Sequence, residues 1–136
     1  MIGMESILET ESADDIKIIK ILNDRLDAVI APDFKEKMTT LLQNGRQMVI
    51  FDLSKVEAID STGLGALVAC LKMVKTGRRP SSGNELPELQ SEPGEIVLCG
   101  ANPTVITLLQ LTRMDRIFHV YDSIQDGLRF LKSNLT

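Results

Sequence analysis

The sequence contains no tryptophan, one histidine and two cysteines, and aromatic residues make up only 4% of it. The lone histidine, His119, has no cysteine or second histidine at ligand spacing, so the sequence offers no zinc-binding motif. The cysteines, Cys70 and Cys99, are too few for a disulfide framework and lie in a helical and a strand pattern. We therefore expect two free thiols that pack in the core of a protein from a reducing compartment.

Long apolar runs and an excess of basic residues are also missing. The longest apolar stretches are too short to span a bilayer. The N-terminal segment MIGMESILETESADD is acidic, whereas a secretory signal would begin with basic residues. The net charge of −4 and the pI near 5.0 argue against a nucleic-acid-binding surface. We expect a cytoplasmic protein with no membrane and no nucleic-acid partner.

The 136 residues, 43% of them hydrophobic and 25% charged, have the size and composition of a single domain, residues 1–136. Segments of strand and helix pattern alternate along them. Strands are expected at 6–10, 16–22, 47–53, 95–100 and 116–121, and helices at 32–45, from Asp60 to Gly77, at 103–111 and at 123–134. This order predicts an α/β fold in which about four helices pack against a mixed, mostly parallel sheet of about four to five strands. The first two strands are expected to pair antiparallel around a turn at Ser12–Asp15.

One segment interrupts this alternation: GRRPSSGNELPELQSEPG, residues 77–94, is rich in proline, glycine, serine and glutamate. Its few large apolar side chains cannot offset the entropy lost when a chain is ordered. We therefore expect residues 78–94 to form a flexible surface insertion. A loop this long is either functional or merely tolerated, and the composition favours a tolerated insertion.

The segment AIDSTGLGAL, residues 58–67, follows a predicted buried strand and opens a helix. Asp60, Ser61 and Thr62 are all residue types that cap helices, and the two glycines that follow allow close approach of another backbone. The free N–H groups and the positive dipole at a helix start favour an anion. Position alone therefore leaves two interpretations of Ser61: a helix cap, which is the commoner role, or a hydroxyl that accepts a phosphate.

Other chemistries find little support in the sequence. The glycines after Thr62 lack the lysine of a phosphate-binding P-loop, and Ser61 does not stand in the Gly-x-Ser-x-Gly pattern of serine hydrolases. His119 lies in a strand pattern that favours a structural role, and packing explains the two cysteines better than a redox pair does. No catalytic set, metal site or cofactor motif emerges. We expect a binding protein that is not an enzyme and needs no cofactor.

Four stretches carry a family resemblance: LDAVIAPDFKEKM (26–38), VIFDLSKVEAIDSTGLGALV (49–68), IVLCGANPTVITLLQLTRMDRIFHVYDS (96–123) and IQDGLRFL (124–131). They resemble the STAS domain, the sulfate-transporter and anti-sigma-factor antagonist family, and within it the bacterial anti-sigma-factor antagonists. The second stretch is the most specific, because it is similar to the family's strand and phosphoacceptor turn. The resemblance covers nearly the whole chain outside the first few residues and the insertion.

The resemblance implies a STAS fold and a regulatory protein that is not an enzyme. In that family the unphosphorylated protein binds an anti-sigma factor that is also a serine kinase of the GHKL type, a histidine-kinase-like ATPase, and so frees a sigma factor. The kinase phosphorylates the serine directly after the aspartate, here Ser61, and a metal-dependent serine phosphatase reverses the modification. The same match places Asp27, Asp60, Thr62 and Gly63 with Ser61 on the partner-binding surface.

Two features depart from the family pattern. The insertion is longer than these antagonists usually carry, and Thr112–Asp115 stands where the family tends to have Thr-Gly-Leu, so a different turn is expected there. Two other functions stay open. A non-switching STAS scaffold or accessory subunit of a sensory or transporter assembly would use the same fold, and a nucleotide hydrolase is a distant third.

Overall fold

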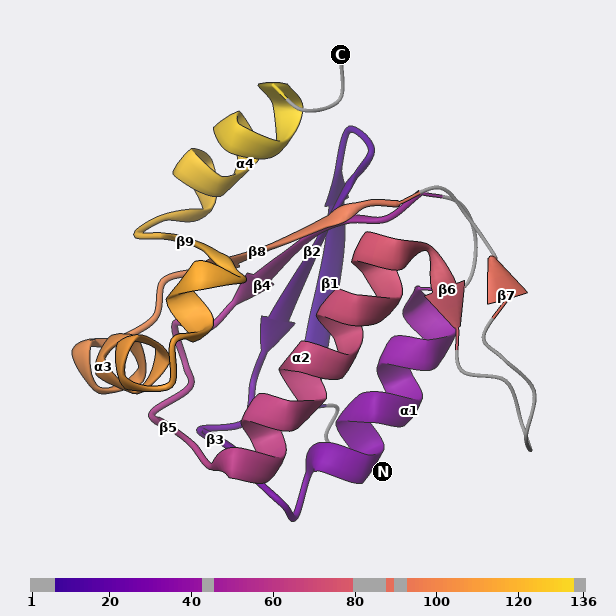
Figure 1. Ribbon diagram of the computed structural model, residues 1–136. Helices are drawn as coiled ribbons and strands as arrows, with labels where there is room; N and C mark the ends of the chain where they lie inside the picture. Colours follow the sequence, from indigo (N-terminus) through magenta and orange to yellow (C-terminus); the bar gives the residue numbers. More distant parts are fainter. Residues whose placement is uncertain (1–6, 43–45, 80–87, 90–92, 134–136) are drawn as a thin grey trace.

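The computed structural model describes residues 7–42, 46–79, 88–89 and 93–133, in which strands and helices alternate as predicted (Figure 1). The strands are β1 (Leu8–Ala13), β2 (Ile16–Ile21), β3 (Arg25–Leu26), β4 (Met48–Asp52), β5 (Ala58–Ile59), β6 (Arg78–Arg79), β7 (Glu88–Leu89), β8 (Glu95–Cys99) and β9 (His119–Tyr121). The helices are α1 (Ala31–Leu41), α2 (Ser61–Thr76), α3 (Pro103–Leu111), the 3-10 turn η1 (Met114–Arg116) and α4 (Ile124–Ser133). None of the described helices combines the length and hydropathy needed to cross a membrane.

The main sheet has five strands in the order β1-β2-β4-β8-β9. Strands β1 and β2 pair antiparallel, and the remaining neighbours pair parallel, which confirms the predicted mixed sheet. The predicted turn between β1 and β2 is too long, because Ser12 and Ala13 continue β1 and only Asp14 and Asp15 remain unpaired. Asp14 has a φ of 57°, a left-handed conformation that aspartate tolerates better than most residues.

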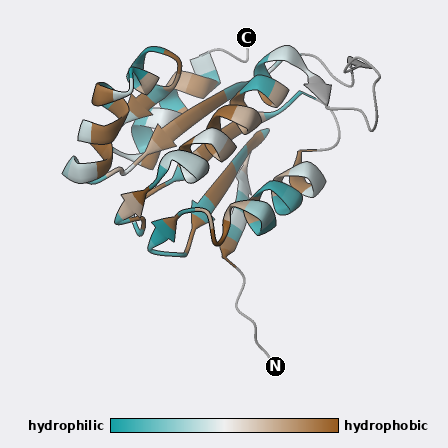
Figure 2. Ribbon diagram, turned by 60° about the horizontal axis from the view of Figure 1, so that its bottom comes forward, coloured by the Kyte–Doolittle hydropathy of each residue, from teal (hydrophilic) through white to brown (hydrophobic). Residues whose placement is uncertain are grey.

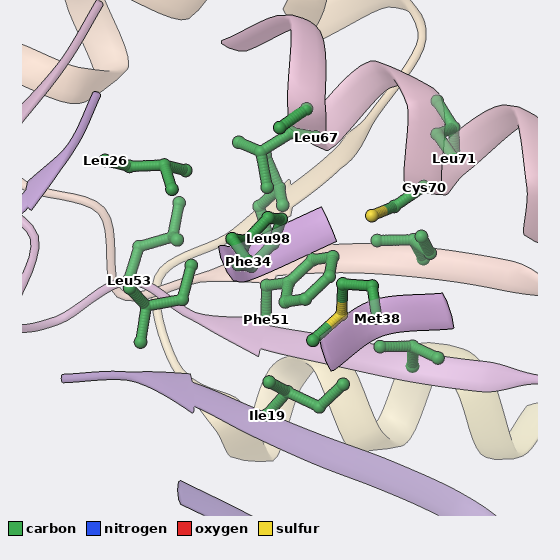
Figure 3. Packing of buried hydrophobic residues seen from close by; sticks show 14 of the residues in the cluster. Ile19, Leu26, Phe34, Met38, Phe51, Leu53, Leu67, Cys70, Leu71 and Leu98 are labelled. Carbon is green, nitrogen blue, oxygen red and sulfur yellow. The ribbon is translucent and has the colours of Figure 1, made fainter. Parts of the chain in front are cut away.

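Helices cover both faces of this sheet (Figure 1). Helices α1 and α2 lie side by side over one face, and α4 packs on the other face against β4, β8 and β9. Beneath α1 and α2, Phe34 and Phe51 meet with ring centroids 5.8 Å apart, and Leu67 is completely buried (Figure 3). Hydrophobic residues are concentrated along the central strands, as expected of a parallel sheet that is covered on both faces (Figure 2).

Capping residues that the sequence predicts define the starts of α3 and α4 and the end of α2. Asn102 caps α3, where its Oδ1 accepts a hydrogen bond from the Val105 N–H at 2.8 Å. The Ser123 hydroxyl accepts from the Asp126 N–H at 3.1 Å at the start of α4. Gly77 ends α2 with a φ of 65°, which glycine adopts without strain. Helix α1 ends at Leu41, and the predicted stop at residues 44–45 lies outside the described residues.

The last strand is shorter than predicted. Strand β9 spans His119–Tyr121 instead of residues 116–121, because Arg113 turns the chain with a φ of 65° and η1 follows directly. This is the turn at which the sequence departs from the family's Thr-Gly-Leu. Here an arginine occupies the left-handed conformation that a glycine would adopt at lower cost.

The predicted insertion lies partly outside the described residues, which exclude 80–87 and 90–92. Its flexibility therefore stays a prediction. Within it, β6 pairs antiparallel with β7. Its last residues are held in place, because the Gly94 N–H donates to the Val74 carbonyl at 2.8 Å and Arg46 Nε donates to the Pro93 carbonyl at 2.9 Å.

Candidate functional site

Asp60 fixes the start of α2. Its Oδ1 accepts a hydrogen bond from the Gly63 N–H at 2.8 Å, so Asp60 is the N-cap of the helix. Its other carboxylate oxygen, Oδ2, accepts from the Ala28 N–H at 3.1 Å. One side chain therefore caps α2 and ties it to the loop that precedes α1. The common interpretation of Ser61 as the helix cap is wrong, because its neighbour has that role.

Asp27, the first residue of the same loop (residues 27–30), also holds this loop through its side chain. Its Oδ1 accepts hydrogen bonds from the Val29 N–H at 3.0 Å and the Ile30 N–H at 3.3 Å. Its Oδ2 lies 3.5 Å from Arg25 Nε in an ion pair that is partly exposed. Asp27 and Asp60 together therefore bind three successive backbone amides of this loop, and they give it a defined conformation beside α2.

The two short strands β3 and β5, which the sequence did not predict, bring the loop and the helix together. They pair in parallel, and directly after them the Asp60 N–H donates to the Leu26 carbonyl at 3.2 Å. Gly63 packs on that carbonyl, since a Cβ there would lie 2.0 Å from the Leu26 oxygen. A Cβ at Gly65 would have nothing within 4 Å. The prediction that another backbone lies close to these glycines is therefore confirmed at Gly63 and wrong at Gly65.

Ser61 and Thr62 are the first two residues of α2, and both are exposed. Within the described part of the chain, neither hydroxyl makes a hydrogen bond. The cap is already complete without them. Ser61 thus presents a free hydroxyl at a helix start, next to a carboxylate.

Hydrogen bonds to backbone amides keep that carboxylate ionised. They hold the pKa of Asp60 below its ordinary value, with the bond from Gly63 as the largest cause. Desolvation opposes the shift, while the amides of Ala28 and Thr62 and the positive charge of Arg25 support it. At neutral pH the residue that precedes Ser61 therefore carries a negative charge.

Comparisons with known proteins match the part of the chain that carries this site. The sequence model of the STAS domain matches residues 8–79, which include loop 27–30 and all of α2. The chain belongs to the STAS domain family.

Two curated relatives of this STAS domain are named as anti-sigma factor antagonists. It is 25% identical over 118 residues to the anti-sigma-B factor antagonist of Staphylococcus aureus, a match that covers 87% of this chain and 94% of that protein. It is 33% identical over 116 residues to a Thermotoga maritima protein named "Putative anti-sigma factor antagonist", with 85% and 88% covered. The solved structure of an anti-sigma-factor antagonist (STAS) domain protein from Planctomyces limnophilus superposes with a TM-score of 0.74 at 21% identity, covering 92% and 97% of the two chains. That last likeness shows the fold.

The sequence-based prediction missed one feature of the STAS domain's site. Val29, whose own N–H donates to Asp27 Oδ1, leaves 84% of its surface exposed. One exposed apolar side chain is ordinary on a protein surface, but Val29 lies on the ordered loop that Asp60 ties to the start of α2. The sequence gives no signal for it, because a valine in a loop carries no pattern that distinguishes an exposed position from a buried one.

The remaining candidates in this STAS domain have structural roles. Cys70 and Cys99 are free and buried, as predicted. Burial raises the pKa of each thiol to about 12, so neither is a ready nucleophile. His119 packs against Phe130 in a tilted arrangement with ring centroids 4.4 Å apart, and its Nε2 lies 3.6 Å from Glu95 Oε2. These contacts account for the histidine without a catalytic role.

Proposed function

We propose that this STAS domain is a phospho-switchable anti-sigma-factor antagonist of the cytoplasm. Unphosphorylated, it binds an anti-sigma factor that is also a serine kinase of the GHKL type, and so frees a sigma factor for transcription. Phosphorylation of Ser61 by that kinase ends the binding, and a metal-dependent serine phosphatase restores it. The protein itself is not an enzyme. Family membership and the names of its relatives support the general role.

The observation that carries the switch is the free hydroxyl of Ser61. It is exposed at the first residue of α2, while Asp60 alone caps the helix. A kinase can therefore modify Ser61 without breaking a native hydrogen bond. Thr62 is also exposed, but its β-branched hydroxyl is more crowded and it stands one residue further from the aspartate.

The proposed partner surface combines this hydroxyl with an apolar contact. Asp60 links the Ser61 position to loop 27–30, where Val29 is exposed. The backbone around Val29 is already ordered by Asp27, so little conformational entropy is lost when a partner covers it. An exposed apolar side chain on this ordered loop fits a partner with an apolar pocket.

Phosphorylation would change this surface without unfolding the helix. A phosphoserine adds about −1.5 to −2 charges, and a helix start tolerates such charge because of its free amides and dipole. The partner, however, would meet that charge beside the carboxylates of Asp60 and Asp27. Repulsion and added bulk at a surface that was complementary before modification explain a loss of binding.

The test uses the protein as bait in lysate from the source organism, with wild type and Ser61→Asp as matched baits. We expect wild type to recover a GHKL-type kinase and Ser61→Asp to recover much less of it. The purified kinase with ATP should then label wild type and Thr62→Ala but not Ser61→Ala, as read by phosphopeptide mapping. Label on Thr62, or undiminished label in Ser61→Ala, would overturn the assignment of the acceptor.

Capture and labelling by the same partner also distinguish a phosphorylation switch from the main alternative, a protein that does not switch. A partner that is captured equally by both baits and that never labels the protein would favour a non-switching scaffold or accessory subunit. Val29→Asp should also weaken capture, whereas Leu111→Asp should not, since Leu111 is an equally exposed apolar residue (78%) at the end of α3. Equal losses from both variants would show that Val29 is not part of the partner surface.

A further inference from the structure

A groove separate from the Ser61 surface lies between the second half of α2 and the segment from η1 to β9. Its volume is about 720 Å³, which is within the range of small-molecule sites. The groove begins at Val68 and extends to Thr76, about two to four helical turns beyond Ser61. The proposal for Ser61 does not use any of the residues that line it.

The floor of this groove is apolar. Leu71 and Phe118 are buried beneath it, and Val68 is partly buried beside them. Ile117 rises from the opposite wall with 41% of its surface exposed, one of the largest exposures among the apolar residues of the described chain. A ligand that fills the groove would therefore remove apolar surface from water, including part of a side chain that the fold leaves exposed.

The rim of the groove is cationic, although the whole chain is acidic. Lys72 and Lys75 lie one turn apart on α2, and Arg116 faces the groove from η1. Asp115 is the one carboxylate among the described residues that line the groove. Lys75 is already paired with Glu95 at 3.4 Å, but Lys72 and Arg116 make no ion pair with any described residue. Among the residues that the structure describes, these two cations thus have no ion-pair partner, and they lie above an apolar floor.

We propose that this groove binds a free small organic anion: a carboxylate, sulfonate or phosphate carried on an apolar body of about eight carbons. The anion lies between Lys72 and Arg116, and the apolar body covers Leu71, Phe118 and Ile117. Charge of the opposite sign at the rim and hydrophobic contact at the floor act together, so a ligand with only one of these properties binds more weakly.

Octanoate is the probe, titrated into the isotope-labelled full chain while amide NMR shifts are recorded. We expect saturable shifts confined to the residues of the groove, with a Kd of about 1 mM for a ligand of this size. Acetate, which lacks the apolar body, and 1-octanol, which lacks the charge, should shift the same amides less. Lys72→Glu and Arg116→Glu should each weaken octanoate binding by about threefold to tenfold.

Lys55→Glu is the matched control, because it makes the same charge change at an exposed loop position outside the groove. Equal weakening by this control, equal binding of 1-octanol, or no saturable shift up to about 10 mM octanoate would overturn the proposal. Shifts of the groove amides with protein concentration alone would also overturn it, since they would show that a second copy fills the groove. Phosphorylation and partner capture can be measured independently in the same variants, so failure here leaves the Ser61 proposal intact.

Discussion

Gly63→Ala and Gly65→Ala form a matched pair that tests how the site is built. The two glycines are two residues apart in the first turns of α2, and both substitutions add a single methyl group. At Gly63 the new Cβ would lie 2.0 Å from the Leu26 carbonyl oxygen and 2.6 Å from its carbon. At Gly65 it would meet nothing within 4 Å. Any difference between the variants therefore reports the contact with Leu26.

The expected magnitudes follow from this geometry. Ordinary contact begins near 3.4 Å, so the new Cβ and the Leu26 carbonyl oxygen must separate by about 1.4 Å. The separation strains the β3–β5 ladder and lengthens the bond from the Asp60 N–H to the Leu26 carbonyl, 3.2 Å in the native structure. Overpacking costs about 1–3 kcal/mol and a weakened hydrogen bond about 1 kcal/mol, while alanine returns up to about 1 kcal/mol of helix propensity. We expect Gly63→Ala to lose about 2–3 kcal/mol and Gly65→Ala to gain about 0.5–1 kcal/mol.

Thermal unfolding followed by far-UV circular dichroism is the suitable assay, because the chain has no tryptophan and one tyrosine. For a domain of this size the free energies correspond to a Tm about 8–12 °C lower for Gly63→Ala and about 2–4 °C higher for Gly65→Ala. Gly63→Ala should also reduce partner capture, since it displaces Ser61 from loop 27–30. Equal Tm values for the two variants would refute the packing of α2 on Leu26.

Three further predictions concern stability. Leu67 is completely buried, so Leu67→Ala should lower the free energy of unfolding in urea by about 2–5 kcal/mol. A cost below about 1 kcal/mol would mean that the stripe of α2 that faces the sheet is misassigned. Arg113 has a φ of 65°, and Arg113→Gly should therefore stabilise the protein by about 1 kcal/mol, whereas a loss would show that the arginine side chain stabilises this turn. The pKa of Asp60 is lowered in the folded state, so its ionised side chain stabilises the fold. This stabilisation is fully present above the unfolded pKa and is lost as the pH falls through the folded pKa. The urea midpoint of wild type should therefore fall relative to that of Asp60→Asn below about pH 4, and a difference that does not vary with pH would contradict this.

The elements that the sequence predicts well are those whose periodic pattern extends over several residues. The apolar run of β4 and the stripe of α2 that holds Leu67 and Leu71 each require one kind of structure. Strands β3 and β5 were missed because each has two residues, and they pair only where the fold brings Leu26 beside Ile59. Strand β9 was predicted too long because an arginine, here Arg113, gives no sequence signal for a left-handed turn.

The candidate site shows the same division between local pattern and tertiary contact. Asp60, Ser61 and Thr62 are equally good capping residues by type, so the sequence located the helix start without assigning the cap. The selection of Asp60 as the cap depends on a tertiary contact, because the Ala28 N–H in the loop before α1 donates to the second carboxylate oxygen of Asp60. The exposure of Val29 is likewise a result of the tertiary structure.

The assignment of the cap also explains how a modification here can act on binding alone. If Ser61 capped α2, a phosphate on its oxygen would compete with the bond to the Gly63 amide and disturb the helix that presents the site. Asp60 makes that bond instead, and its lowered pKa keeps it charged and bonded over the physiological pH range. The residue that holds the helix and the residue proposed to accept the phosphate are therefore adjacent but separate. Added charge at Ser61 changes what a partner meets, while the anchor of loop 27–30 stays in place.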